Sequence, residues 1–115
     1  MKLIDRKTLL QMPKGTVFAK KTQIFEETSP ILVLGECLKN DFLYVNISSF
    51  SYGNGSIDTC DAFWSLEKNL GENIEMELWE GRDGMFDDEE MYYVFSKDEV
   101  QQMVDELTEA LKTGY

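Results

Sequence analysis

Two strand patterns joined by a very short turn constrain the fold of this chain most strongly. Residues 31–34 are apolar on both faces, and residues 42–48 alternate, with Leu43 and Tyr44 on opposite faces. Residues 39–41, Lys-Asn-Asp, are typical of a hairpin turn. We therefore predict that the two strands are antiparallel neighbours, and that residues 31–34 form a central strand covered on at least one side.

The remaining elements follow from the same periodicities. Further strands are predicted at 15–21, 74–80 and 91–95, and a turn at 26–30. A first helix over 5–12 has Asp5 as its N-cap and ends before Pro13, whereas a second begins at Asp58 or Thr59. The second helix has its apolar residues at core-facing spacing and ends at Gly71; these residues are Ala62, Phe63, Trp64, Leu66 and Leu70.

The last helix has the clearest sequence signal. Ser96 and Glu99 form a capping box, and apolar residues then follow the helical period as far as Leu111, with acids mostly on the other side. The predicted order is α-β-β-β-α-β-β-α with short links. The 115 residues therefore predict one α+β domain over 1–115, an antiparallel sheet of about five strands packed by two to three helices.

The net charge of −11 is distributed very unevenly. Residues 1–57 carry seven Lys/Arg and five Asp/Glu, whereas residues 58–115 carry four and seventeen. An acidic surface of this kind repels nucleic acid and anionic membrane, because binding to either depends on basic side chains. The natural complement is a basic protein surface.

Composition also narrows the chemistry. The chain has no histidine, which excludes Ser-His-Asp and Cys-His mechanisms, and it has no glycine-rich phosphate-binding motif. Cys37 and Cys60 lack the spacing of a metal or redox motif and are expected to be free, buried thiols. Charges at residues 5–7 interrupt any signal peptide, and no apolar run reaches membrane-spanning length, so the predicted location is the cytoplasm.

Residues 81–95, GRDGMFDDEEMYYVF, concentrate five carboxylates between Asp83 and Glu90. A calcium loop needs oxygen ligands at alternating positions, but Met85 and Phe86 stand where ligands belong. We therefore predict no metal and no cofactor here. Asp-Gly is a strong hairpin signal, and the stretch is interpreted mainly as a hairpin connection whose acids keep it solvated.

The strand before this connection extends the acidic character. Glu75 and Glu77 are predicted on its outer face, and Trp79 shares that face. Aromatic residues on strands are more often core residues than binding residues, yet a Trp surrounded by acids is typical of an interface anchor. The predicted partner-binding residues are Glu75, Glu77, Trp79, Glu80, Asp83, Asp87, Asp88, Glu89 and Glu90.

Two segments, LIDRKTLLQMPKGTVFAK and GRDGMFDDEEMYYVFSKDEVQQMVDEL, resemble small acidic proteins carried by bacteriophages and prophages. In those proteins a short helix leads to a Pro-x-Gly-Thr strand start, and a Gly-Arg-Asp-Gly-x-Phe-Asp-Asp turn precedes an aromatic strand and a final helix. The resemblance implies no activity and no catalytic residue. It implies a context, because such proteins often bind and block a host protein.

These observations together predict a non-enzymatic binding protein. Its acidic face is expected to dock on a basic site of a host or defence protein, such as a nucleic-acid-binding site, and to inhibit that protein by standing in for phosphates. One alternative is sequestration of a small molecule or nucleotide, in a pocket closed by the 48–56 loop or across a homodimer interface. A second alternative is an enzyme that uses carboxylates and a divalent ion.

Overall fold

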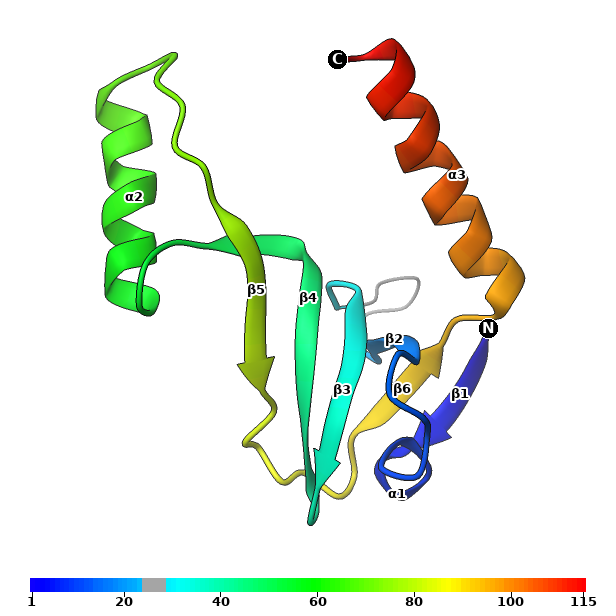
Figure 1. Cartoon of the computed structure of the whole chain (residues 1–115). Coiled ribbons are helices and arrows are strands. Elements are labelled where there is room, and N and C mark those ends of the chain that lie inside the picture. Colours follow the sequence, from blue (N-terminus) through cyan, green and yellow to red (C-terminus); the bar gives the residue numbers. More distant parts are fainter. Residues whose placement is uncertain (24–28) are drawn as a thin grey trace.

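The computed structural model describes residues 1–23 and 29–115. It is an α+β fold in which a six-stranded, fully antiparallel sheet has the order β1-β6-β2-β3-β4-β5 (Figure 1). The predicted fold class is confirmed, with six strands rather than about five. The predicted turn at 26–30 lies mostly outside the described residues. The elements are β1 (Lys2–Asp5), α1 (Arg6–Leu9), β2 (Val17–Lys20), β3 (Leu32–Leu38), β4 (Asp41–Ser51), α2 (Ser56–Lys68), β5 (Glu77–Arg82), β6 (Met91–Val94) and α3 (Lys97–Thr113).

The hairpin of β3 and β4 forms as predicted. The two strands pair antiparallel, and Asn40 in the turn between them has a φ of 59°, a conformation that asparagine tolerates better than most residues. The register shifts between Leu34 and Cys37, where β3 makes a bulge. β3 lies inside the sheet between β2 and β4, in agreement with its apolar sequence.

Strand β1 was not predicted, and it changes the start of the fold. It pairs with β6 from Lys2 opposite Val94 to Asp5 opposite Met91, at one edge of the sheet. Four residues with one buried side chain, Ile4, give too weak a local pattern to reveal a strand. Asp5 is the N-cap of α1, as predicted, and accepts a hydrogen bond from the Thr8 amide at 2.9 Å.

The core lies where the sheet meets α1. Phe18 of β2, Phe42 of β4 and Tyr92 of β6 are fully buried, and their rings pack edge to face with centroids 5.7 to 6.0 Å apart. We call these three residues the aromatic triad. Around it lie the buried apolar side chains of Ile4, Leu9, Leu32, Leu34 and Val94.

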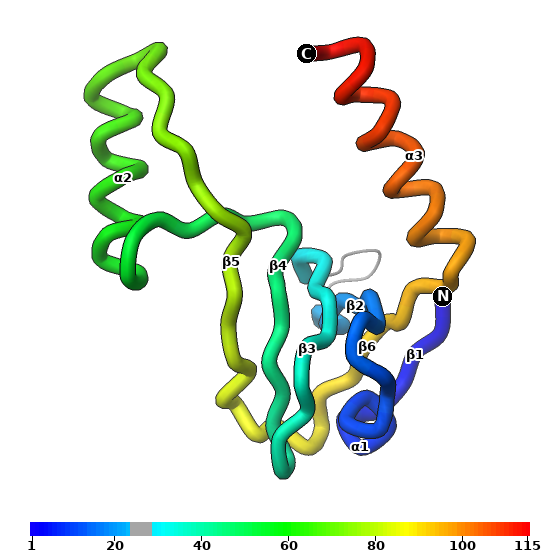
Figure 2. The backbone as a smooth tube through the Cα atoms, viewed as in Figure 1, coloured from blue at the N-terminus to red at the C-terminus, as the bar shows by residue number. Residues whose placement is uncertain are grey.

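Helices α2 and α3 extend away from the sheet (Figure 2), and most of their apolar side chains are exposed. In α2 only Thr59 and Ala62 are buried, whereas Phe63 is 48% and Trp64 65% exposed. Leu70, beyond the helix end, is 92% exposed. The prediction of a core-facing second helix was therefore wrong. No helix in the described part of the chain is long and apolar enough to cross a membrane.

The start of α2 also differs from the prediction. Strand β4 continues to Ser51, so the predicted loop over 48–56 shrinks to four residues, and the helix begins at Ser56 with Gly55 as N-cap. Asp58 and Thr59 do not cap the helix. Their side chains instead accept hydrogen bonds from the amides of Asn54 and Tyr52 at 2.8 and 3.0 Å, and so hold the loop in place.

Residues 83–90 do not form a hairpin connection, contrary to the prediction. Strands β5 and β6 are separated in the sheet by β2, β3 and β4, so the segment between them crosses the end of the sheet, as Figure 1 shows. Gly84 has a φ of 65°, and Phe86 has a φ of 51° with its side chain 47% exposed. The Asp-Gly signal marks a turn within this crossover, not a link between neighbouring strands.

Candidate functional site

Most of the acids predicted to bind a partner are exposed, on or beside edge strand β5. Glu77 and Glu80 belong to β5, which among the described strands pairs with β4 alone, and Glu75 precedes it. The crossover contributes three more exposed acids. We call the resulting surface the acidic face, formed by Glu75, Glu77, Glu80, Asp87, Asp88 and Glu89.

Asp83 and Glu90 have different surroundings from these acids. Asp83 is buried, and its carboxylate accepts hydrogen bonds from Arg6 and from Lys20, each at 2.8 Å. Glu90 is half-buried and pairs with the same Lys20 at 3.0 Å. The two carboxylates belong to the interior of the crossover, so Asp83 in particular is not available on the surface where the sequence analysis placed it.

The ion pairs of Asp83 belong to a larger ion cluster centred on the buried Arg6. The Arg6 guanidinium is 2% exposed, lies over the Phe42 ring, and donates hydrogen bonds to the Tyr92 hydroxyl at 3.1 Å and the Asn40 carbonyl at 2.8 Å. One of its nitrogens lies 3.9 Å from a carboxylate oxygen of Asp41. The cluster consists of Arg6, Lys20, Asp41, Arg82, Asp83 and Glu90.

Asp41 connects the hairpin turn to the start of the crossover. Its side chain is 1% exposed, pairs with Arg82, and accepts hydrogen bonds from the amides of Phe42 at 2.9 Å and Gly84 at 3.0 Å. Burial alone raises the pKa of a carboxyl group, but these partners outweigh it and lower the pKa of Asp41. For Asp83 too, the pairing with Lys20 and Arg6 outweighs burial and lowers the pKa.

From this cluster and its Tyr92 partner we predict that the free energy of unfolding falls at both low and high pH. Because the pKa of Asp83 is lowered in the folded state, its ionised carboxylate stabilises the fold above pH 3.8, the ordinary pKa of the group. This contribution is lost as the pH falls below 3.8. Burial raises the pKa of Tyr92 from 10.0 to about 12, so its contribution is present below pH 10.0 and is lost as the pH rises through 12. Urea denaturation midpoints measured across the pH scale will show both declines.

Tyr92→Phe is the matched control for the pH series, because it removes the titrating hydroxyl and keeps the ring in the core. The variant is expected to show a shallower alkaline decline and an unchanged acid decline. If stability declines as steeply at alkaline pH in the variant as in the wild type, ionisation of Tyr92 is not the cause of that decline. Lys20, whose pKa is raised by its pairing with Asp83 and Glu90 in spite of burial, accounts for the part that remains.

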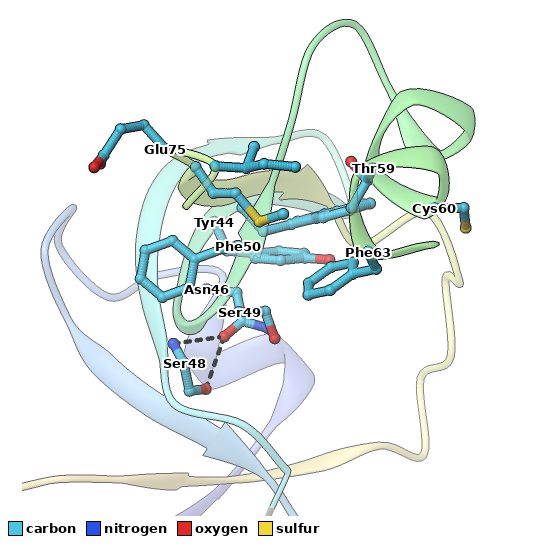
Figure 3. Close-up of a pocket in the computed structure, with 12 residues that line it drawn as sticks. Tyr44, Asn46, Ser48, Ser49, Phe50, Thr59, Cys60, Phe63 and Glu75 are labelled. Carbon is cyan, nitrogen blue, oxygen red and sulfur yellow. Dashed lines mark hydrogen bonds between the residues drawn. The ribbon is translucent and has the colours of Figure 1, made fainter. Parts of the chain in front are cut away.

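A second feature beside the acidic face is an open hollow of about 840 Å³ between α2 and the outer strands (Figure 3). We call it the aromatic groove. Asn46 and Ser48 lie at one side of it, where Ser48 donates to the Asn46 side chain through its amide at 3.0 Å and its hydroxyl at 2.9 Å. The apolar lining consists of Tyr44, Phe50, Phe63, Ile74, Met76 and Trp79.

Trp79 lies in the lining of this groove together with Glu75, and it also borders a smaller hollow beside Glu77 and Glu80. It is half-buried, whereas Glu75 and Glu77 are exposed. Figure 3 shows the Glu75 carboxylate pointing away from the rings of Phe50 and Phe63. Trp79 was predicted to share a face with Glu75 and Glu77, and the structure places it beside these acids, half-buried in the groove wall. Phe63 was not predicted as a groove residue, because its spacing in α2 resembles that of a core residue.

The residues of this region can attract both cationic and apolar groups. Electron-rich aromatic rings attract Lys and Arg side chains as well as apolar groups, and carboxylates nearby add long-range attraction for cations. Among the described residues, no three His, Cys, Asp or Glu side chains are placed to hold a metal ion. Both cysteines are free; burial raises the pKa of Cys37, whereas Cys60 is exposed, contrary to the prediction.

Comparisons of the chain with protein-family profiles, curated protein sequences and solved structures found no match.

Proposed function

We propose that this chain is a non-catalytic binding protein that docks its acidic face and aromatic groove on a basic surface of another protein. One observation carries the proposal. Edge strand β5 holds exposed acids and, between them in sequence, Trp79 in the wall of an apolar groove. Charge and an apolar anchor site are thus adjacent on one element.

The two features have separate roles in docking. The exposed carboxylates attract a basic surface over long range and speed association, but exposed charge pairs add little affinity by themselves. Affinity comes mainly from residues buried in the complex, and Trp and Tyr are common among them. A partner segment that carries Lys or Arg next to an aromatic or aliphatic side chain matches both features.

The resemblance to phage proteins supports the cellular setting of the proposal. The partner is then a host or defence protein in the bacterial cytoplasm, and docking on its nucleic-acid-binding site inhibits it. Six exposed carboxylates held along a sheet edge and an ordered crossover are suited to replace phosphates, because the partner's basic groups are already arranged for negative charge.

The test is reversal of four charges on the acidic face, in the variant Glu75→Lys/Glu77→Lys/Asp87→Lys/Asp88→Lys. The purified chain serves as bait in a lysate of its bacterial host, and the captured protein is then purified and titrated calorimetrically at increasing salt. We expect wild-type affinity to fall with salt and the variant to bind roughly a hundredfold more weakly or worse. Trp79→Ala is expected to cost about 2 kcal/mol of binding free energy.

A matched control separates docking from a general charge effect. The variant Asp98→Lys/Asp105→Lys/Glu106→Lys/Glu109→Lys makes the same change in net charge on α3, away from the acidic face. It is expected to retain most of the affinity. If both variants lose binding equally, or if the first retains it, the acidic face is not the docking surface.

The aromatic groove also favours a second candidate function, sequestration of a small molecule. Its volume of about 840 Å³ falls within the range of about 300–1,000 Å³ that is usual for ligand pockets. Native mass spectrometry of protein purified from its host distinguishes the two functions. A retained ligand that Phe63→Ala releases would favour sequestration, whereas bare protein would favour docking.

A further inference from the structure

Within the described residues, the apolar side of α3 has no packing partner beyond the base of the helix. All residues of α3 are described by the structure and none is buried. Val100 is half-buried at the base of the helix, and exposure then rises to 47% at Val104, 64% at Leu107 and 70% at Leu111. These four residues, which we call the α3 stripe, form an apolar row whose exposure increases toward the C-terminus of the helix.

The stripe has the spacing and the flanks of a helix-pairing seam. Its residues recur at intervals of four, three and four, the pattern that brings side chains together along a seam between two helices. The positions that border such a seam are uncharged here: Gln101, Met103, Thr108 and Ala110. All acids of the helix lie outside the stripe and its borders, toward the other side of the helix: Asp98, Glu99, Asp105, Glu106 and Glu109.

This charge arrangement favours a second copy of the chain as the partner. Two molecules with a net charge of −11 each repel one another, so they can associate only through a surface without acids. The α3 stripe and its borders are such a surface. A basic partner would instead need acids beside the apolar residues, as on β5.

The size and shape of the chain indicate that a large surface remains to be covered. Its accessible surface is 8669 Å², whereas about 6,500 Å² is expected for a compact monomer of 13.3 kDa. The radius of gyration is 16.2 Å, against about 13 Å for a compact chain of this length. The excess of about 2,200 Å² exceeds the roughly 800 Å² per partner that a stable interface usually buries.

A groove at the base of α3 indicates how the second copy is oriented. Val100 borders a hollow of about 770 Å³ that is also lined by Met12, Val17, Val94 and Phe95. An antiparallel partner helix brings its C-terminal turn, with Leu111, to this hollow, whereas a parallel one leaves the hollow open. Antiparallel helices also align their dipoles favourably.

We propose that the chain forms a homodimer in which α3 pairs antiparallel with α3 of a second copy, stripe against stripe. The C-terminal turn of each helix covers the groove at the base of the other. The acids of both helices then lie on the outside of the pair, and the acidic face on β5 of each copy stays free.

Sedimentation equilibrium of the full chain tests the proposal. We expect the wild type to have twice the 13.3 kDa chain mass, and Leu107→Glu to have the mass of one chain. The substitution enters a two-fold interface twice, so the dissociation constant of the dimer is expected to rise by roughly a hundredfold or more. Gln102→Glu adds the same charge on the opposite side of α3 and is expected to leave the dimer intact.

Folding and orientation are checked separately. Near-ultraviolet circular dichroism reports the packing of the aromatic triad. We expect the spectrum to be unchanged in Leu107→Glu, because Leu107 is not a core residue. In a Cys60→Ser background, Val100→Cys with Leu111→Cys is expected to give a covalent dimer on oxidation, and Val100→Cys alone none. A monomeric wild type, a dimeric Leu107→Glu, or a covalent dimer from Val100→Cys alone would each overturn the proposal.

Discussion

Replacing Arg6 with methionine is expected to lower the free energy of unfolding by about 3–5 kcal/mol, because the change removes one of the two cations paired with buried Asp83 and the donor to Tyr92 and Asn40. Arg6 is the centre of the ion cluster, and its side chain contacts Asp83, Asn40 and Tyr92 at 2.8 to 3.1 Å. Methionine has a similar length, so the loss comes from charge and hydrogen bonds more than from volume. Urea denaturation followed by tryptophan fluorescence measures it.

Lys7→Met is the matched control for Arg6→Met, since it removes the same charge from the next residue, which is exposed. It is expected to change stability by less than about 0.5 kcal/mol. Adding Asp83→Asn to Arg6→Met removes the buried charge that has lost one of its two partners and is expected to recover part of the loss. Equal stability of the Arg6 and Lys7 variants would show that the ion cluster does not hold the crossover in place.

Phe18→Ala is expected to cost a similar amount, about 3–5 kcal/mol, through loss of buried area and the cavity left behind. Phe18 is fully buried, and its ring meets Phe42 at 5.7 Å and Tyr92 at 5.8 Å between centroids. A domain of this size has a total stability of about 5–15 kcal/mol, so the loss is a large fraction of the whole. Thermal and urea denaturation both measure it.

Phe63→Ala serves as the control for Phe18→Ala, because Phe63 has the same side chain but is 48% exposed on α2. We expect it to cost less than half as much. If the two substitutions destabilise the protein equally, α2 contributes to the core in solution and the aromatic groove is partly closed. A small effect of Phe18→Ala alone would show that the aromatic triad is not the centre of the core.

The parts of the fold that the sequence predicted are those fixed by neighbouring residues. The β3–β4 hairpin needs only strand alternation and a turn, and the structure shows both, with Asn40 at positive φ. The capping box of Ser96 and Glu99 is also local, and both of its hydrogen bonds are present. In each case the interacting residues lie within a few positions of one another.

The parts that could not be predicted depend on residues far apart in the chain. Arg6 and Asp83 are separated by 77 positions, and nothing near either residue shows that they meet. Strand β1 exists because β6 pairs with it. The apolar faces of α2 and α3 follow the helical period, but periodicity indicates only that a face is apolar, not what it packs against.

The same distinction applies to the candidate site. The exposure of Glu77, Glu80 and Asp87 follows from the usual preference of acids for water, and the structure agrees. Asp83 is the exception, since its burial depends on two cations brought from other elements. The aromatic groove combines residues from α2, β4 and β5, so only the folded chain reveals it.

The position of β6 has a consequence for the order in which the chain can assemble as it is synthesised. β1 and β2 do not pair with each other; each pairs with β6, which lies between them and is the last strand to be made. Until residue 94 is available, β1 and β2 lack this partner, and Arg6 lacks Asp83 until the crossover has been made. Strand β1 and the β6-facing edge of β2 therefore wait for the second half of the chain, whereas β2, β3 and β4 can pair with one another earlier, so the sheet is expected to be completed late in synthesis.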